Sequence, residues 1–417
     1  MATQTSPQPG TPVEEWRDKK RFLWLMGLIP PTAIFMALGM IWAFNQLGWN
    51  AVSPIWWWIG PMLVYGLLPV LDLFFGPDGQ NPPDEVMERL ENDKYYRYCT
   101  YAYIPFQLTS LVLACYLWTA DNLSWLGIDG GLGLISKIGL AISVGVMGGV
   151  GINTAHEMGH KKDSLERWLS KVTLAQTFYG HFYIEHNRGH HVRVATPEDP
   201  ASAKFGESFW KFLPRSVWGS LKSSWHIEKT RMERLGKSTW NIRNDVLNAW
   251  LMSVVLFGAL TAVFGVSILP FLLIQAVYGF SLLETVNYLE HYGLLRAKTK
   301  SGRYERCAPE HSWNSDHIVT NIFLYHLQRH SDHHANPTRR YQILRSMEGA
   351  PNLPSGYASM ISLAYFPPIW RKVMDHRVIE HYDGDITKVN IDPSKREKVL
   401  ARYGVTAGTD STRESDR

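Results

Sequence analysis

Six long apolar segments, separated by polar stretches, dominate the pattern of this chain. They cover residues 22–44, 55–75, 99–120, 134–155, 246–264 and 266–289. Each approaches or exceeds the roughly twenty apolar residues that a helix needs to cross the hydrocarbon core of a bilayer. Since a helix satisfies its own backbone hydrogen bonds in lipid, the pattern predicts an all-α integral membrane protein with six transmembrane helices.

The distribution of lysine and arginine predicts how these helices are oriented. The connections 45–54 and 121–133 carry no basic residue, whereas Lys20, Arg97 and Lys161 flank the opposite ends of the spans. Basic residues favour the cytoplasmic side, so the N-terminus is expected inside. With an even number of spans, both termini and all sixteen histidines are expected on the cytoplasmic side of a bacterial inner membrane.

The same pattern divides the chain into six regions. They are a polar N-terminal tail (1–21), four spans (22–155), a histidine-rich region (156–245), two spans (246–289), a second histidine-rich region (290–405) and a disordered tail (406–417). The two histidine-rich regions are expected to form a helical cytoplasmic cap. The first sixteen residues lack the basic and apolar pattern of a signal peptide.

Two shorter patterns concern packing. Residues 81–94 predict an amphipathic helix with Val86 and Leu90 on one face, lying on the membrane surface or in solvent. Four glycines give the fourth span a small-residue face that predicts close packing of another helix: Gly145, Gly148, Gly149 and Gly151.

Composition excludes several classes of function. The net charge of +4 is small and scattered, which argues against nucleic acid as a partner. The three cysteines form no CxxC pair, so the chain has no iron–sulfur site or zinc ribbon, and reducing equivalents must come from elsewhere. The spans are almost free of ionisable residues, which argues against a metal transporter.

The first histidine motif, His156-Glu-Met-Gly-His160, ends the fourth span. Two imidazoles at this spacing lie one above the other on a helix face. The motif fits a zinc metalloprotease with Glu157 as general base, and it also fits half of a soluble di-iron carboxylate bundle. Taken alone, it leaves the chemistry open.

Three further segments indicate two metals. Residues 186–191 (HNRGHH) and 330–334 (HSDHH) each add three imidazoles, and His291 adds one at the end of the sixth span. Nine imidazoles exceed what one metal can bind, so we expect two metals with four or five nitrogens each. Imidazole suits iron, copper and zinc about equally, so the ligands alone do not select the element. The predicted ligands are His156, His160, His186, His190, His191, His291, His330, His333 and His334.

Carboxylates next to these histidines are candidates for an outer layer of the site. Metal-bound imidazoles usually donate their other ring N–H to a carboxylate, and neighbours on a helix point apart. Each acid is therefore expected to orient a histidine from another segment, with a helix cap or a surface position as the alternative. The candidates are Glu157, Glu185, Glu290 and Asp332; His311 and His317 are further ones.

The histidine segments, with residues 194–200 (VATPEDP) and 287–293 (NYLEHYG), resemble the membrane-bound alkane 1-monooxygenases. The resemblance extends from about residue 15 to residue 403, and the NYxEHYG element distinguishes it from the fatty-acyl desaturases. It implies a centre of two iron ions, molecular oxygen as co-substrate, and a separate rubredoxin as electron donor. The implied reaction is terminal hydroxylation of medium-chain n-alkanes to 1-alkanols. A fatty-acyl desaturase or fatty acid omega-hydroxylase is the alternative.

The substrate and the electron donor each require a binding site. A terminal methyl group has no charge or acidic proton, so a metal-bound oxidant must begin the reaction, and a narrow apolar channel from the lipid would give terminal selectivity. Val64 and Leu68 in the second span are candidate lining residues, with ordinary helix packing as the alternative. Four basic residues beside the histidines are candidates for donor docking, although membrane topology also explains them: Lys161, Arg188, Arg339 and Arg340.

Overall fold

The all-α prediction with six spans is confirmed. The computed structural model describes residues 16–405, and among them it has helices and isolated bridges but no strand. Six helical stretches are long and apolar enough to cross a membrane: Leu23–Gln46, Ser53–Phe75, Lys94–Thr119, Leu134–Gly159, Asp245–Phe264 and Val266–Glu290.

The spans contain several shorter helical pieces. The first is η2 (Leu23–Leu28) with α1 (Ile29–Gln46), and the second joins η3 (Ser53–Trp58), α2 (Ile59–Pro61), the π-helix η4 (Met62–Leu67) and α3 (Leu68–Phe75). The others are α5 (Lys94–Thr119), α6 (Leu134–Gly159), α11 (Asp245–Phe264) and η8 (Val266–Ile268) with α12 (Leu269–Glu290). Gly265, with φ of +82°, makes the tight turn from α11 into η8.

Apart from η5 (Ser124–Leu126), which joins α5 to α6 at the opposite end of the bundle, the remaining elements form the cap. Its helices are α4 (Asp84–Asn92), α7 (Ser164–Leu174), α8 (Phe182–Ile184), the π-helix η7 (Glu185–His190), α9 (His191–Arg193), α10 (Phe209–Arg234), α13 (Ile318–Phe323), α14 (His330–Ala335), α15 (Tyr357–Ala364), α16 (Pro367–His381) and α17 (Arg396–Arg402). Short 3-10 turns connect them, among them η6 (Ala175–Thr177), η9 (Pro309–His311) and η10 (Tyr341–Ile343).

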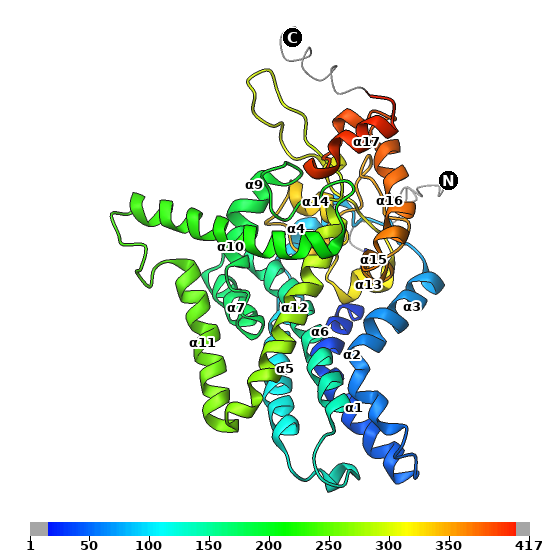
Figure 1. Cartoon of the computed structure of the whole chain (residues 1–417), viewed down its shortest axis with the longest axis vertical. Coiled ribbons are helices and arrows are strands. Elements are labelled where there is room, and N and C mark those ends of the chain that lie inside the picture. Colours follow the sequence, from blue (N-terminus) through cyan, green and yellow to red (C-terminus); the bar gives the residue numbers. More distant parts are fainter. Residues whose placement is uncertain (1–15, 406–417) are drawn as a thin grey trace.

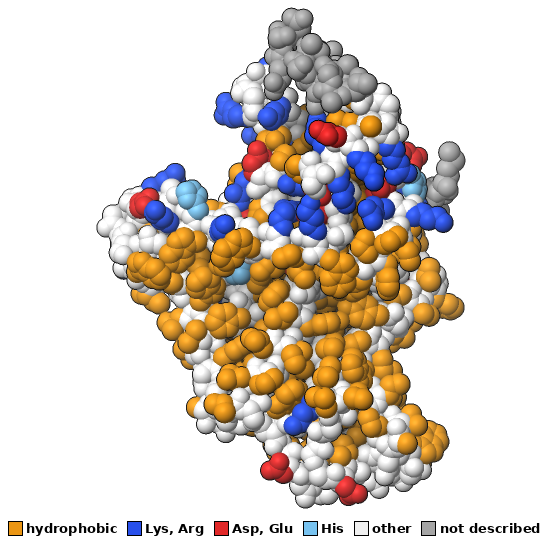
Figure 2. Space-filling view, in the orientation of Figure 1, with side chains coloured by type: hydrophobic (Ala, Val, Ile, Leu, Met, Phe, Trp, Pro, Cys, Tyr) orange, Lys and Arg blue, Asp and Glu red, His pale blue; other side chains and the backbone are white. Residues whose placement is uncertain are grey.

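The cap covers one end of the bundle of spans (Figure 1). Figure 2 shows a broad apolar surface around the spans, with lysine and arginine side chains gathered where the cap begins. This separation is what a bilayer requires, because lipid-facing side chains are apolar and basic ones remain near the headgroups. The chain is a multi-pass membrane protein.

The helix α6 is the centre of the bundle and packs most closely on α12. A Cβ atom at Gly149 would lie 2.9 Å from the carbonyl oxygen of Gly279, and one at Gly145 would lie 3.0 Å from that of Gln275. The two backbones can approach this closely only because these residues lack side chains. The predicted packing role of the glycine face is therefore seen in the structure.

We expect Gly149→Leu to destabilise the fold by about 1–3 kcal/mol, because the new side chain must push α6 away from α12. The measurement is the thermal unfolding midpoint of the purified protein in detergent. Gly258→Leu on α11 is the matched control, since a Cβ there meets nothing within 4 Å. Equal midpoints for the two variants would contradict this role of Gly149.

The predicted helix at 81–94 is the shorter α4, and its apolar face is covered by protein. Val86 and Leu90 are buried in a cluster with Trp24 and Ile343, and the Leu90 carbonyl accepts a hydrogen bond from Gln342. This apolar face therefore contacts neither the membrane surface nor solvent. The sequence does not reveal that Gln342 and Ile343 cover this face, because they lie about 250 residues further along the chain.

Only a short part of the predicted terminal tails can be compared with the structure. Residues 1–15 and 406–417 lie outside the described residues. Residues 16–21, the described part of the predicted N-terminal tail, make contacts with the start of two spans and with the segment before α4. Asp18 accepts hydrogen bonds from Trp24 in η2 and Tyr96 in α5, and Lys20 pairs with Asp78 at 2.9 Å.

Candidate metal centre

All nine predicted histidine ligands come together at the boundary between the spans and the cap. They form two groups, and within each group the potential ligand nitrogens lie within 4.8 Å of one another. The five-histidine group consists of His156, His160, His186, His191 and His333. The four-histidine group consists of His190, His291, His330 and His334.

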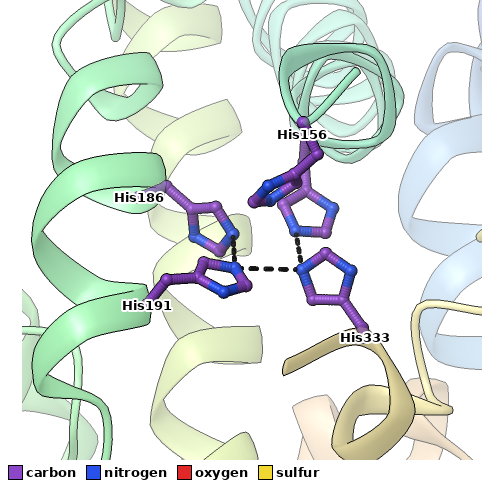
Figure 3. Close-up of side chains that lie close together, drawn as sticks. His156, His186, His191 and His333 are labelled. Atoms are coloured by element: carbon purple, nitrogen blue, oxygen red, sulfur yellow. Dashed lines mark hydrogen bonds between the residues drawn. The ribbon is translucent and has the colours of Figure 1, made fainter. Parts of the chain in front are cut away.

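Three elements supply the five-histidine group: the end of α6, the segment η7–α9, and α14. Figure 3 shows the rings of His156, His186, His191 and His333 turned toward a common centre. The Nε2 atoms of His156 and His333 are 2.9 Å apart, and that of His191 lies 3.0 Å from His186 and 3.1 Å from His333.

The four-histidine group lies directly beside it. The His330 Nε2 atom is 3.2 Å from that of His291 and 2.9 Å from that of His334. The rings of His191 and His334, one from each group, have centroids 4.4 Å apart. The two groups are therefore close enough to act on one substrate together.

The structure separates histidines that are adjacent in sequence. In the π-helix η7 the chain makes wider turns than in an α-helix, so His186 and His191, five residues apart, reach the same group. His190 points to the other group. In α14, His330 and His334 at i and i+4 share a group while His333 belongs to the neighbouring one.

The donor set fits metal ions. Nitrogens bound to one ion at about 2.1 Å lie a few ångströms apart, as these do. Hydrogen bonding alone cannot satisfy the chain of contacts from His186 through His191 and His333 to His156. The Nε2 atoms of His191 and His333 each have two such contacts but carry only one hydrogen or one lone pair. The buried Nε2 atoms of His160 and His190 have no hydrogen-bond partner. Shared cations would satisfy all of these lone pairs.

Burial also keeps these rings in the form that binds metal. Desolvation, with repulsion from neighbouring rings and charges, lowers the pKa of the buried histidines below its usual value near 6.5, and the pKa of His291 falls to about 3. Neutral imidazole is the ligand form, so no proton must leave at neutral pH. The histidines with this lowering are His160, His186, His191, His291, His330, His333 and His334.

Asp199 is an outer partner that the sequence reasoning missed. Its Oδ2 atom lies 2.8 Å from Nδ1 of His190, and the carboxylate is fully buried. Burial alone raises the pKa of Asp199, but interaction with His190 and a hydrogen bond from Ser202 outweigh this and hold it at about 2. The only available signal was the acid in the VATPEDP stretch that follows the histidine motif.

Two other outer partners involve predicted residues. Glu290 adjoins His291 in sequence, and its Oε1 atom lies 3.3 Å from Nδ1 of His330 in another segment, a close approach without a hydrogen bond. His311 contributes through its backbone, because its carbonyl oxygen is 3.0 Å from Nδ1 of His291. Both contacts leave the Nε2 atom of the histidine free to face the centre of the four-histidine group.

The other three candidate carboxylates have different partners. Glu157 pairs with Lys161 at 2.9 Å and accepts the backbone N–H of Tyr341, so it is not free to act as the base of a zinc protease. Glu185 pairs with Arg193 at 2.6 Å. Asp332 accepts hydrogen bonds from Arg339, from Asn336 and from the backbone of residue 345. These acids hold the histidine segments in place and contact no ring.

The four candidate docking residues are all paired with carboxylates. Lys161 and Arg340 are buried, and Arg340 makes two bonds to Glu166, so neither presents charge at the surface. Arg188 and Arg339 reach the surface, but Arg188 binds Glu228 and Asp245, and Arg339 binds Asp332. The sequence alone could not reveal these pairings, because most of the partners lie far along the chain.

An apolar cavity borders the metal centre. The second span, α6, α12 and α15 contribute to its wall, and Val64 and Leu68 are both lining residues. Asn153, one turn before His156, is the α6 lining residue nearest the histidines, none of which lines the cavity itself. Ser143 lies about 15 Å further along the same helix. The cavity thus extends from a point one helical turn from His156 into the depth of the membrane.

Its few polar wall residues bond to the protein. Asn153 donates to the Leu324 carbonyl at 2.8 Å, and Ser143 donates to the Trp57 carbonyl at 2.7 Å. Thr320 donates to Asp72. Among the described residues that line the cavity none is charged, so the space suits a hydrocarbon and offers nothing to bind a carboxylate.

Comparisons with known proteins agree with this geometry. The model of the fatty acid desaturase family matches residues 135–364. The chain is 48% identical to the alkane 1-monooxygenase of Acinetobacter baylyi, covering 93% of this chain and 92% of that protein. It is 43% identical to those of Ectopseudomonas oleovorans (95% of each chain) and Alcanivorax borkumensis (96% and 95%). The protein therefore belongs to the alkane 1-monooxygenase family, which shares its histidine plan with the fatty acid desaturases.

Proposed function

We propose that this protein hydroxylates the terminal carbon of medium-chain n-alkanes at a centre of two iron ions. The observation that carries the proposal is the apolar, uncharged cavity whose wall reaches Asn153, one helical turn from His156 of the two adjoining groups of imidazoles. The names of the relatives support the substrate class. The overall reaction consumes the alkane, molecular oxygen, two electrons and two protons, and it yields a 1-alkanol and water.

The five-histidine group would hold one iron and the four-histidine group the other. Iron in this setting supplies the redox chemistry with oxygen that an unactivated methyl group requires. The protein's own residues hold neutral imidazoles in two groups, orient His190 through Asp199, and line the approach with Val64 and Leu68. Terminal selectivity requires that this approach admits only a chain end to the metals.

Electrons come from a separate redox partner, for which we propose rubredoxin, reduced in turn by its own reductase. The chain has no CxxC pair, so no rubredoxin module is part of it. Of the four basic docking candidates, Arg188 and Arg339 alone remain at the surface. We further infer that the cap faces the cytoplasm at the bacterial inner membrane, because the basic residues gather on its side.

The alternative is a fatty-acyl desaturase or a fatty acid omega-hydroxylase, and the match to the desaturase family favours it. Such an enzyme must bind a carboxylate or thioester head group, for which the cavity wall has no cationic side chain. A hydrocarbon substrate therefore explains the uncharged cavity wall better than a substrate with a head group.

The test is a parallel assay of octane and decanoate with purified protein, rubredoxin and rubredoxin reductase. We expect 1-octanol from octane, little product from decanoate, and two iron ions per chain by metal analysis. Product from decanoate alone would replace the proposal with its alternative. One zinc per chain and no oxygen consumption would exclude an oxygenase.

A further inference from the structure

Three tyrosines join the second span to α12 and α15. The hydroxyl of Tyr65 lies 2.6 Å from that of Tyr278 and 3.2 Å from that of Tyr365. Tyr65 belongs to η4, Tyr278 to α12, and Tyr365 directly follows α15. We refer to these three residues as the tyrosine cluster.

On its inner side the tyrosine cluster adjoins the apolar cavity. Tyr65 follows Val64, which lines the cavity, while Tyr278 lies one helical turn before Leu282. Tyr365 lies one turn after Ile361, another lining residue. The same three elements that form this part of the cavity wall are therefore tied together by phenol hydroxyls. α15 lies between α3 and α12 and packs on both (Figure 1).

On its outer side the tyrosine cluster adjoins side chains that face lipid. Leu67 in η4 and Val277 in α12 are each 47% exposed, and Phe366, next to Tyr365, is 57% exposed. The tyrosines themselves are half-buried. They form the layer between the lipid-facing surface and the cavity along the seam where η4, α12 and α15 meet.

The tyrosine cluster is suited to opening. Its side-chain hydrogen bonds are the hydroxyl contacts among the tyrosines and one from Thr285 to Tyr365 at 3.4 Å. The Tyr365 ring also packs against Tyr65, Phe209 and Trp210, and its carbonyl accepts the Trp210 N–H. No charged side chain takes part in these contacts. Tyr65 lies in a π-helical segment, and such segments are rare and concentrate at functional sites. Side chains of this size rotate far faster than helices rearrange.

We propose that the tyrosine cluster is the gate through which the alkane passes from the bilayer into the cavity. This inference rests on the proposed function. The substrate is dissolved in lipid and has no polar group, so it needs an apolar path. That path opens when the Tyr65 hydroxyl parts from Tyr278 and Tyr365, and it closes behind the substrate. The three hydroxyls thus govern how fast the alkane is captured, while the histidine groups govern the chemistry.

The first test removes hydroxyls and keeps the rings. For Tyr65→Phe and Tyr278→Phe we expect kcat/KM for octane to rise about three- to fivefold, the effect of losing one hydrogen bond, with kcat unchanged. kcat/KM reports capture of free substrate, whereas kcat reports the steps after capture. Tyr103→Phe is the matched control. The Tyr103 hydroxyl donates a 2.7 Å hydrogen bond to the Met147 carbonyl, and Tyr103 does not belong to the seam. Unchanged or lower kcat/KM in the two seam variants would overturn the gate and leave a packing role.

The second test closes the seam covalently. Tyr65→Cys with Tyr278→Cys, in a Cys307→Ser background, is joined with a bifunctional thiol reagent that contains a cleavable bond. We expect octane turnover to fall more than about tenfold on cross-linking and to return on cleavage, with metal content constant. Turnover that survives complete cross-linking would overturn the proposal. Wild-type protein is assayed in parallel, so absence of octanol there would refute the proposed function and not the gate alone.

Discussion

Replacing His291 by alanine is expected to reduce octane turnover more than about a hundredfold and to lower the iron content from two ions per chain toward one. Loss of an outer partner of a metal ligand already reduces affinity or activity by about 10- to 100-fold, and loss of a ligand must exceed this. His291 is one of only four imidazoles in its group, and it alone directly follows a span. The measurements are metal analysis and 1-octanol formation.

The geometry explains why no other residue replaces it. The ring is fully buried, its Nδ1 atom lies 3.0 Å from the His311 carbonyl, and its Nε2 atom lies 3.2 Å from that of His330. Alanine leaves three imidazoles and an empty space beside them. The five-histidine group keeps all its members and is expected to keep its ion.

His376→Ala is the control for His291→Ala. His376 is an exposed histidine on α16 that contacts the Lys372 carbonyl and Arg377. It should keep both ions and full turnover. If His291→Ala behaved like His376→Ala, His291 would no longer count as a ligand and the four-histidine group would need a different fourth member.

The spans and the histidines that come together could be predicted from the sequence because both follow short-range rules. A bilayer of fixed thickness imposes about twenty apolar residues on each span, and this signal lies within one segment. The repeated spacing in HNRGHH and HSDHH likewise marks histidines that share one helical turn. Such patterns depend on helical geometry and not on which segments later meet.

The assignment of histidines to groups could not be predicted, because it depends on the type of helical turn. Ordinary α-helical spacing treats 186–191 as one converging unit. The π-helix η7 instead sends His186 and His191 to one group and His190 to the other. The burial of Lys161 and Arg340 was equally hidden, since the cap folds back over α6 and supplies their partners.

Asp199 was not identified from the sequence for a related reason. It lies nine residues after His190, beyond the end of α9, so no helical period connects the two. The chain doubles back through a turn in which Asp199 accepts hydrogen bonds from the Ala201 backbone and from the Ser202 hydroxyl at 2.6 Å. That turn fixes the carboxylate and, through it, the imidazole of His190.

We expect Asp199→Asn to weaken metal binding at the four-histidine group and to reduce octane turnover by about 10- to 100-fold. The carboxylate, whose pKa is held near 2, accepts the Nδ1 proton of His190 and leaves Nε2 bare for the metal. An amide nitrogen in the same place donates to Nδ1 instead, which moves the ring proton to Nε2 and removes the ligand. The measurement is a chelator titration of bound iron alongside turnover.

Glu198→Gln, at the exposed neighbouring position, is the matched control, because it makes the same chemical change without contact to a histidine ring. It should leave affinity and turnover at the wild-type level. An Asp199→Asn protein that held iron as tightly as the wild type would show that His190 keeps its tautomer without the carboxylate. The same result would mean that the turn at 199–202 serves folding alone. A loss of affinity confined to Asp199→Asn would instead link this turn directly to the metal centre.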